Sequence, residues 1–187
     1  IENSIAGSIL PNLGILHNSR LQVTGEYYLH IRQNLMALPG VGLEGIEEVH
    51  SHPMALLQCV DFLDTHRWRL VETEDTALSA RRIAERGIRN AAAIAGDLAA
   101  ELFGLEIVAA DIHSIRNNYT RFLVLRPDHQ PIDERSDKAS LCFKTDHRHG
   151  SLIRVLREME DSTINMTKLQ SSPIPSEPWH YMFHVDM

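Results

Sequence analysis

Three consecutive stretches set the fold class: IEEVHSHPMALLQCVDFL (46–63), WRLVETEDTALSARRIAERG (68–87) and NAAAIAGDLAAELFG (90–104). Each begins with a short run of strand-forming or small apolar residues and continues with a helical pattern. Strands that alternate with helices predict a mostly parallel sheet with helices on its faces, which is the α/β class. Such sheets bind ligands at the carboxyl ends of their strands.

Local signals define the helices of this region. Pro53 is suited to a first helical turn, and the apolar residues Leu56, Cys59, Val60 and Leu63 predict one helix over 53–63. Asp75-Thr76 predicts the start of a second helix that ends at Gly87. A third helix is expected over 96–103, followed by Gly104 as its C-terminal cap.

The flanking sequence adds further elements to this pattern. Asn3 and Ser4 are good N-cap types, so a helix is expected from them to Ile15. Apolar and β-branched residues predict strands at 21–31, 33–38, 46–50, 68–72, 90–95, 105–112 and 122–125.

The C-terminal third predicts a separate small module. Residues 127–137 are polar with two prolines, which is typical of a linker. Beyond the linker, a strand at 138–145, a helix opened by Gly150, and strands at 164–170 and 180–187 give a β-α-β-β order. This order is the beginning of an α+β module.

Composition excludes several classes of function. The 187 residues are 43% hydrophobic with a formal charge of −7, which supports a proper core and argues against nucleic acid as a partner. No apolar run is long enough to span a bilayer. Cys59 and Cys142 are far apart among apolar neighbours, so we expect reduced thiols in a cytosolic protein. The chain starts at Ile1 with no signal peptide and no initiator Met, so we expect that the natural amino terminus is not included.

The junction of a polar run and an apolar run at Asn117-Asn118-Tyr119-Thr120-Arg121-Phe122 is the best candidate for chemistry. A hydroxyl such as that of Thr120 can hand a proton to a leaving group, and the guanidinium of Arg121 can hold a carboxylate. Taken alone, this tripeptide is equally consistent with an ordinary strand entrance.

The order of several short motifs resembles that of the prephenate dehydratase family. These motifs are Glu2-Asn3-Ser4, Ser51-His52-Pro53, Gln58, Asp75-Thr76-Ala77 and Thr120-Arg121-Phe122. Residues 138–187 resemble the ACT regulatory domain of the same family. The ordered set is specific, although each motif alone is weak.

The resemblance implies a fold and a domain organisation. It implies a two-lobed catalytic domain like a periplasmic binding protein over 1–126, a linker over 127–137 and a ferredoxin-like ACT domain over 138–187. It further implies that the first lobe is incomplete and that the ACT domain lacks its final helix and strand. A chorismate mutase fused upstream is left open.

The implied activity is the decarboxylative dehydration of prephenate to phenylpyruvate in L-phenylalanine biosynthesis. No metal or organic cofactor is expected. The implied partners are prephenate, L-phenylalanine as a feedback effector, and other copies of the chain in a homodimer or homotetramer. No nucleic-acid or membrane partner is expected.

The resemblance also assigns roles to residues. Thr120 is the expected catalytic residue, and Asn3, Ser51, Gln58, Thr76 and Arg121 are expected to bind substrate. Glu2 and Glu74 are expected to be structural, and Phe122 to pack beneath the site. The expected effector-binding residues are Gly150, Ser151, Leu152 and Asn165.

Structural alternatives stay open for several of these residues. Asn3, Ser51 and Thr76 are also good helix caps, and Gln58 could satisfy a buried backbone group. The histidine pairs His50/His52 and His147/His149 lack the further ligands of a metal site.

The chain departs from the family pattern at four places. Met54 follows Ser-His-Pro where Gln is usual, and Leu78 follows Asp-Thr-Ala where Gly is frequent. Ser151 replaces Ala, and Ser172 replaces the Arg of Glu-Ser-Arg-Pro, which bears on the strength of phenylalanine regulation. The rival functions are a non-catalytic two-lobed binding protein and an amino-acid sensor.

Overall fold

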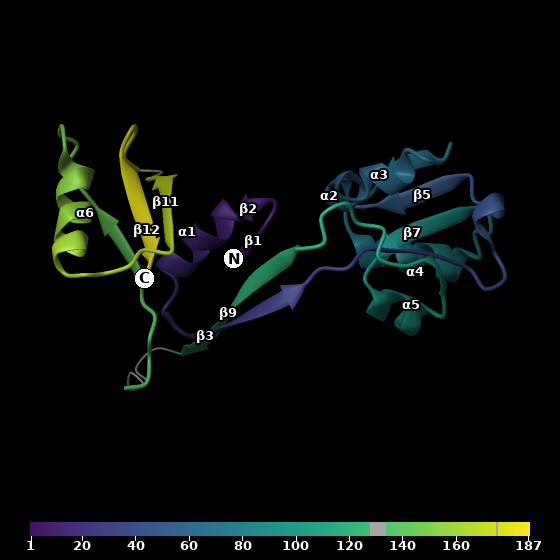
Figure 1. Ribbon diagram of the computed structural model, residues 1–187, viewed down its shortest axis with the longest axis horizontal. Coiled ribbons are helices and arrows are strands. Elements are labelled where there is room, and N and C mark those ends of the chain that lie inside the picture. The colour runs from purple at the N-terminus through teal and green to yellow at the C-terminus, as the bar shows by residue number, and fades with distance from the viewer. Residues whose placement is uncertain (128–133, 175) are drawn as a thin grey trace. The chain divides into compact units, whose positions relative to one another are not determined.

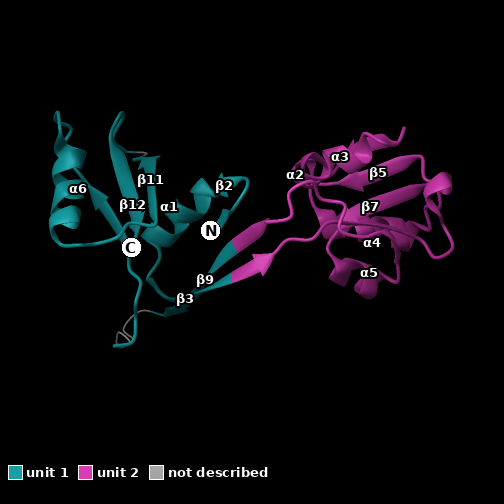
Figure 2. Cartoon of the chain, in the orientation of Figure 1, with its two compact units in different colours: residues 1–27, 121–187 teal, residues 28–120 magenta. Residues whose placement is uncertain are grey.

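The computed structural model describes residues 1–127, 134–174 and 176–187 (Figure 1). The chain forms two compact units (Figure 2). Unit 1 comprises residues 1–27 and 121–187, and unit 2 comprises residues 28–120. The predicted linker at 127–137 lies largely outside the described residues, since 128–133 are not described.

Unit 2, which is described throughout, contains a five-stranded mixed sheet of order β6-β5-β7-β4-β8. Its strands are β4 (Asn34–Ala37), β5 (Glu48–Ser51), β6 (Arg69–Glu72), β7 (Ala91–Ala95) and β8 (Glu106–Ala109). β5 pairs in parallel with β6 and β7, whereas β4 is antiparallel to both β7 and β8. Four strands therefore share one direction, so the prediction of a mostly parallel sheet is confirmed. The prediction did not include the antiparallel strand β4 within the sheet.

Helices cover both faces of this sheet. They are α2 (Pro53–Gln58), α3 (Val60–Leu63), α4 (Thr76–Arg86) and α5 (Asp97–Phe103), with a 3₁₀ turn η1 at Leu43–Gly45. Strand β7 is buried along its whole length. Its Ala92 and Ile94 join the core under α2 and α3, and its other three alanines join the core under α4 and α5. Alternation of side chains across a strand produces this division, and small residues let both helical layers approach.

The expected helix ends are confirmed at Gly87 and Gly104. Both adopt the left-handed conformation, with φ of 62° and 66°, which glycine reaches without a Cβ penalty. The prediction of one continuous helix over 53–63 is wrong, because the chain breaks at Cys59 between α2 and α3. The backbone carbonyl of Gln58 accepts a hydrogen bond from the Ser114 amide (2.8 Å), a long-range contact that accompanies the break.

The N-terminal part of unit 1 differs from the prediction of a helix starting at Asn3 or Ser4. The segment instead forms β1 (Glu2–Asn3) and β2 (Gly7–Ser8), and helix α1 follows at Leu10–Asn18. The side chain of Asn3 accepts hydrogen bonds from the amides of Ile5 (3.0 Å) and Ala6 (2.9 Å). Asn3 therefore closes a turn here. In a turn and in a helix N-cap alike, an Asn side chain accepts hydrogen bonds from amides two or three residues further along.

Two long strands each contain residues of both units. β3 (Leu21–His30) and β9 (Tyr119–Pro127) complete a sheet of order β2-β1-β9-β3. The expectation that Phe122 is core is wrong, since its side chain is 47% exposed. Phe122 and Val124 share one exposed face of β9, whereas Arg121 and Leu123 share the more buried face.

The C-terminal part of unit 1 has the predicted β-α-β-β order. It comprises β10 (Ser140–Lys144), α6 (Ser151–Asp161), β11 (Lys168–Pro173) and β12 (Tyr181–Asp186). The sheet order is β10-β12-β11 and both pairings are antiparallel, so β12 is the central strand. In the described part of the chain, the helices fall short of the length and apolar character that a bilayer crossing requires.

We expect the two thiols to react at different rates with iodoacetamide in the native protein. Cys59 is fully buried, and burial raises the pKa of its thiol from 9.0 to about 12. Each pKa unit lowers the thiolate fraction about tenfold, and the thiolate is the reactive form. Burial also raises the pKa of the Cys142 thiol, but this residue is only partly buried. Mass spectrometry after labelling at pH 8 should therefore find Cys142 modified and Cys59 unmodified. Labelling in urea, where both should react, is the control, and equal native rates would contradict the structure.

Candidate active site

One edge of the unit 2 sheet collects several of the predicted site residues. The parallel strands β5 and β6 end together, with Ser51 paired to Glu72 in the register, and helices α2 and α4 begin just beyond them. The antiparallel strand β4 starts at the same edge, where Asn34 pairs with Ala95 at the end of β7. This is the edge at which α/β sheets bind ligands.

Ser51 lies within this edge with its side chain turned into the sheet. It is fully buried, and its hydroxyl donates a 2.6 Å hydrogen bond to the carbonyl oxygen of Ile94 on β7. The predicted capping role of Ser51 is wrong, because the N-cap of α2 is His52, whose Nδ1 accepts from the Met54 amide (3.1 Å). The Ser51 hydroxyl thus ties two strands together at the point where the candidate site begins.

The start of α4 has a cap other than the one expected. Asp75 is the N-cap, and its carboxylate accepts from the Leu78 amide (2.8 Å), so the expectation that Thr76 caps the helix is wrong. Thr76 is the first helical residue and is half-buried. Glu74 forms an ion pair with Arg82, whose hydrogen bonds hold the pKa of the Glu74 carboxyl below its ordinary value. This ion pair is compatible with the structural role expected for Glu74, which stays a prediction.

Gln58 joins helix α2 to the loop that leads to Thr120. Its side-chain oxygen accepts from the Gln33 amide group (3.2 Å), and its backbone carbonyl accepts from Ser114. Gln33 is buried, and its own carbonyl accepts from the Ile112 amide (2.9 Å). The Gln58 side chain therefore pairs with another side chain, and not with the buried backbone group of the structural alternative.

The loop before Thr120 is also hydrogen-bonded at its C-terminal end. The Ile31 amide donates to the carbonyl of Asn118 (2.8 Å), and Asn118 is fully buried. His30 stacks on Tyr119 with ring centroids 4.8 Å apart. These contacts fix the backbone directly before the half-buried Thr120.

The predicted residues of unit 1 lie close to charged partners. Glu2 forms ion pairs with Lys168 and with the guanidinium of Arg121, which is compatible with the structural role expected for it. Arg121 is only 11% exposed and also forms ion pairs with Glu26 and Asp186. Asn3 and Arg121 belong to unit 1, whereas Ser51, Gln58, Thr76 and Thr120 belong to unit 2.

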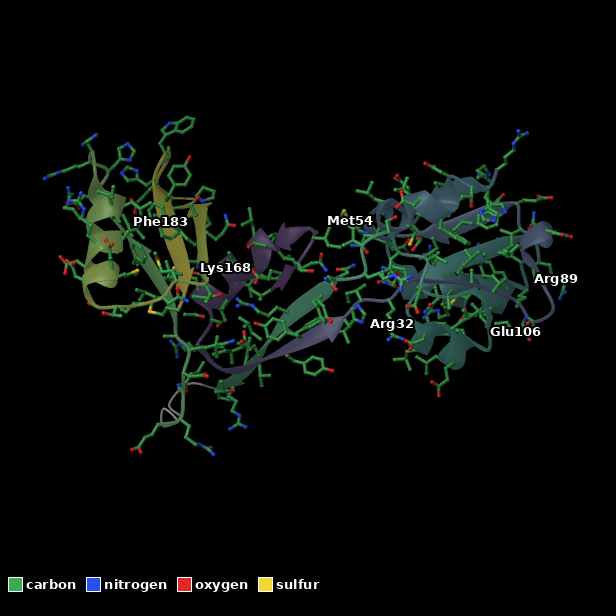
Figure 3. All side chains as sticks on the ribbon, viewed as in Figure 1. Arg32, Met54, Arg89, Glu106, Lys168 and Phe183 are labelled. Carbon is green, nitrogen blue, oxygen red and sulfur yellow. The ribbon has the colours of Figure 1, made fainter. Side chains whose placement is uncertain are left out.

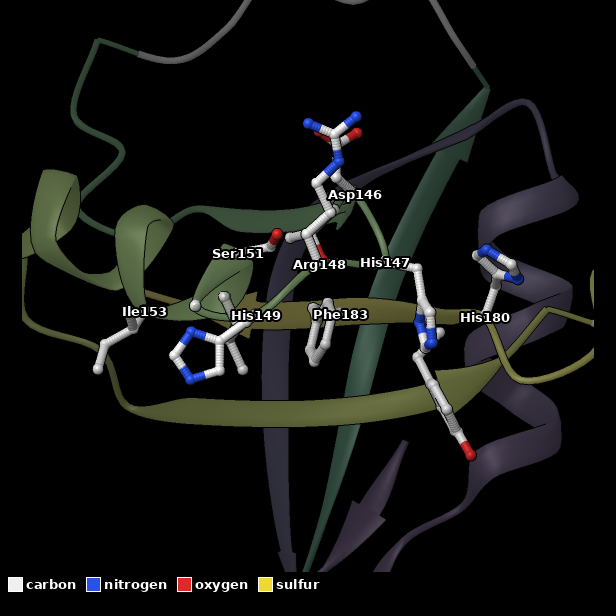
Figure 4. Close-up of a pocket in the computed structure, with 12 residues that line it drawn as sticks. Asp146, His147, Arg148, His149, Ser151, Ile153, His180 and Phe183 are labelled. Atoms are coloured by element: carbon white, nitrogen blue, oxygen red, sulfur yellow. The ribbon is translucent and has the colours of Figure 1, made fainter.

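A cavity of about 450 Å³ lies in the C-terminal part of unit 1 (Figure 4). Of the predicted effector residues, Gly150, Ser151 and Leu152 line it. Asn165 is not among the lining residues and follows α6 in the segment before β11. The remaining lining residues are Thr145, Asp146, His147, Arg148, His149, Ile153, His180, Tyr181 and Phe183.

The wall of this cavity combines a helix start with apolar and aromatic side chains. Gly150, at φ 75°, turns the chain into α6. Ser151 is buried and its hydroxyl accepts a hydrogen bond from Arg154 (2.9 Å). His147 and His180 lie at one side with ring centroids 5.0 Å apart (Figure 4). Such a cavity suits a small molecule with an anionic group and an apolar body.

Sequence reasoning missed two kinds of contributor. Gln33 and Ser114 hold the Thr120 loop to Gln58, yet they belong to no motif. A polar residue at the entrance of an apolar strand was the available signal for Gln33. Asp186 and Lys168 approach Arg121 and Glu2 from the C-terminal strands, and no local pattern could indicate contacts across such a sequence separation.

Comparison with known proteins gives consistent matches. The family profile described as prephenate dehydratase matches residues 1–130. The bifunctional chorismate mutase/prephenate dehydratase of Neisseria gonorrhoeae is 40% identical over 192 residues, which cover 100% of this chain and 52% of that protein. The chain therefore spans about half the length of this relative.

Two solved structures have the same fold. A prephenate dehydratase from Arthrobacter aurescens in complex with L-Phe has a TM-score of 0.87 and 28% identity, covering 96% of this chain and 61% of that one. A protein described as GqqA, a novel type of quorum quenching acylase, has a TM-score of 0.90 and 28% identity, covering 100% of this chain and 68% of that one.

Replacing Ser51 with Ala should destabilise the protein by about 1–2 kcal/mol, because a buried carbonyl loses its hydrogen-bond donor. Urea unfolding followed by circular dichroism measures the change. Ser114→Ala is the matched control, since Ser114 is exposed and its hydroxyl accepts only a long 3.4 Å hydrogen bond from Asp61. Equal unfolding midpoints for wild type and Ser51→Ala would show that this bond does not hold the edge together.

Proposed function

Because the chain belongs to the prephenate dehydratase family, we propose that the protein containing it converts prephenate to phenylpyruvate, water and carbon dioxide. The observation that carries this proposal is the anchored loop that leads into β9, where Thr120 is the second residue and Arg121 follows it. The proposed setting is L-phenylalanine biosynthesis in the cytoplasm.

The reaction asks the protein for positioning and polarisation. The bond between the ring and its carboxylate breaks, its electron pair enters the ring, and the ring hydroxyl leaves with a proton as water. Aromatisation drives both cleavages. The Thr120 hydroxyl is a weak acid, so its role is to hydrogen-bond and orient the departing oxygen. A catalytic hydroxyl of this kind needs a fixed backbone, which the contacts of Asn118 and Tyr119 provide.

The other predicted residues divide into two groups in this proposal. Asn3, Gln58, Thr76 and Arg121 are proposed to contact the substrate, which is a dianion and needs donors and a cation. Ser51 is proposed to support the site without contacting the substrate, because its hydroxyl already donates to the Ile94 carbonyl within the sheet. No cofactor is part of the proposal.

We propose a two-lobed catalytic domain over 1–126 and an ACT domain over 138–187. The three-layered α/β arrangement of unit 2 is consistent with one lobe of a periplasmic-binding-protein-like domain. The β-α-β-β order of β10 to β12, with β12 central, is consistent with the first part of a ferredoxin-like module. ACT modules pair across subunits, so a homodimer or homotetramer is the proposed assembly.

The cavity at the start of α6 is the proposed site of a feedback effector, L-phenylalanine. Gly150, Ser151 and Leu152 form the first turn of a helix of 11 residues, whose N-terminal end favours a carboxylate. Ile153 and Phe183 supply apolar surface for a side chain such as a phenyl ring. Asn165 is retained as a proposed contributor even though it does not line the cavity of this chain. Ser172, which replaces the family's Arg, is close to the His184 ring (3.0 Å).

Thr120→Ala in the full-length protein should lower kcat for prephenate by about a hundredfold or more, as expected for loss of a hydrogen bond to the departing oxygen. KM should change little, because the substrate's carboxylates are held by other residues. Formation of phenylpyruvate, followed by its absorbance in alkali, measures both constants.

Thr65→Ala is the matched control for this variant. Thr65 is an exposed threonine at the end of α3 whose hydroxyl donates to Phe62 (2.7 Å). Near-normal turnover by Thr120→Ala would remove Thr120 from its proposed role. Absence of turnover by the wild type would overturn the dehydratase assignment and favour a binding protein.

A further inference from the structure

The guanidinium of Arg121 is enclosed by three carboxylates of unit 1, those of Glu2, Glu26 and Asp186, which we term the carboxylate cluster. Arg121 Nε lies 3.3 Å from Glu2 Oε1, and Nη1 lies 3.5 Å from Glu26 Oε2. Nη2 donates to Asp186 Oδ2. Each of the three nitrogens therefore faces a carboxylate, and the Arg121 side chain is only 11% exposed.

Positive groups already offset the charge of the carboxylate cluster before any ligand arrives. Lys168 forms an ion pair with Glu2, and Lys138 forms one with Glu26. Among the described groups, Arg121, these two lysines and the Ile1 ammonium, which interacts with Glu2, supply the positive charge that faces the three carboxylates. A dianionic substrate brought to Arg121 would leave a local excess of negative charge, which is unfavourable where the groups are largely screened from water. Substrate binding at Arg121 therefore requires one carboxylate to withdraw.

Asp186 differs from the other two carboxylates in its place in the chain. Glu2 and Glu26 lie on β1 and β3 in the proposed catalytic region, whereas Asp186 is the last residue of β12. Tyr181 and Phe183 of the same strand line the cavity. In Figure 3, the labelled Phe183 and Lys168 lie on the adjacent strands β12 and β11.

Strand β12 connects the cavity to Asp186 through a continuous, paired stretch of backbone. It is paired with β11 over residues 181–186 and with β10 over residues 182–186. Phe183 stacks against Phe143 with ring centroids 5.6 Å apart. Asp186 Oδ1 accepts from the Ser140 hydroxyl (2.7 Å). At about 3.3 Å per residue, the three steps from Phe183 to Asp186 span about 10 Å of strand.

The ionisation of Asp186 is consistent with this role. Burial raises the pKa of its carboxyl, but the hydrogen bonds from Ser140 and Arg121 and the positive charges of Arg121 and Lys168 together lower it below its ordinary value. Asp186 is therefore a carboxylate at neutral pH and a direct rival to another carboxylate for the guanidinium.

We propose that Asp186 competes with the substrate's carboxylate for Arg121, and that a ligand in the cavity strengthens the Asp186–Arg121 pair through β12 and so weakens substrate binding. The proposal rests on the proposed function and names the contact through which its feedback would act. Because coupling between two sites is reciprocal, substrate must also weaken binding of the cavity ligand.

Asp186→Asn in the full-length protein tests the competition. We expect KM for prephenate to fall about threefold or more with kcat unchanged, and the L-phenylalanine concentration for half-inhibition to rise about fivefold or more, which is the lower end of typical coupling between sites. Asp186→Glu should restore much of the inhibition. Asp161→Asn is the matched control, because Asp161 lies at the exposed end of α6.

A second variant distinguishes loss of the Asp186–Arg121 pair from unfolding of the protein. Ser140→Ala removes the other hydrogen bond of Asp186 and keeps its charge, so it should raise the half-inhibiting concentration in the same direction by a smaller factor. An increased KM for Asp186→Asn would overturn the proposal, because Asp186 would then position Arg121 for the substrate. Unchanged KM and unchanged inhibition in folded variants would also overturn it. Failure of the wild type to convert prephenate would instead reject the proposed function.

Discussion

The ion pairs around Arg121 are the interaction on which the organisation of unit 1 depends. They bring together residues from β1, β3, β9 and β12, which are distributed over the whole length of the chain. Removing one member would leave the others with uncompensated charge in a partly buried place, which costs more than an exposed ion pair contributes. The residue after the proposed catalytic threonine is thus part of the same charge network as the C-terminal strands.

Unit 2 depends on a different constraint, which is the space available between two helical layers. The alanines of β7 leave room for α4 and α5 on one face of the sheet, while Ile94 fills the other face. Ser51 is buried in the same arrangement, and its hydroxyl donates a hydrogen bond to the Ile94 carbonyl. A rigid sheet edge follows, and the loop before Thr120 is attached to it through Gln33 and Gln58.

Much of this fold was predictable from periodicity. The alternation of strands and helices over 46–104 and the β-α-β-β order of the C-terminal part rest on local patterns, and so do the caps at Gly87 and Gly104.

The direction of β4 was not predictable, because its apolar residues are the same in either orientation. The turn at Asn3 was mistaken for a helix start because Asn accepts from nearby amides in both. Phe122 was expected in the core on hydrophobicity alone, whereas strand alternation places it on the exposed face. Of the site, the sequence could indicate Gln58 and Arg121 but not their partners Gln33 and Asp186, since such pairings depend on tertiary contacts.

The loop from Ile112 to Asn118 has a consequence for the thermodynamics of ligand binding. It has no regular secondary structure, yet its backbone is hydrogen-bonded at Ile112, Ser114 and Asn118 to residues outside it. Ordering an irregular segment of this length when a ligand arrives would cost about 1–2 kcal/mol per residue in conformational entropy. Here this conformational entropy is lost during folding. Ligand binding therefore does not have to order the loop, and the binding free energy is not reduced by that cost.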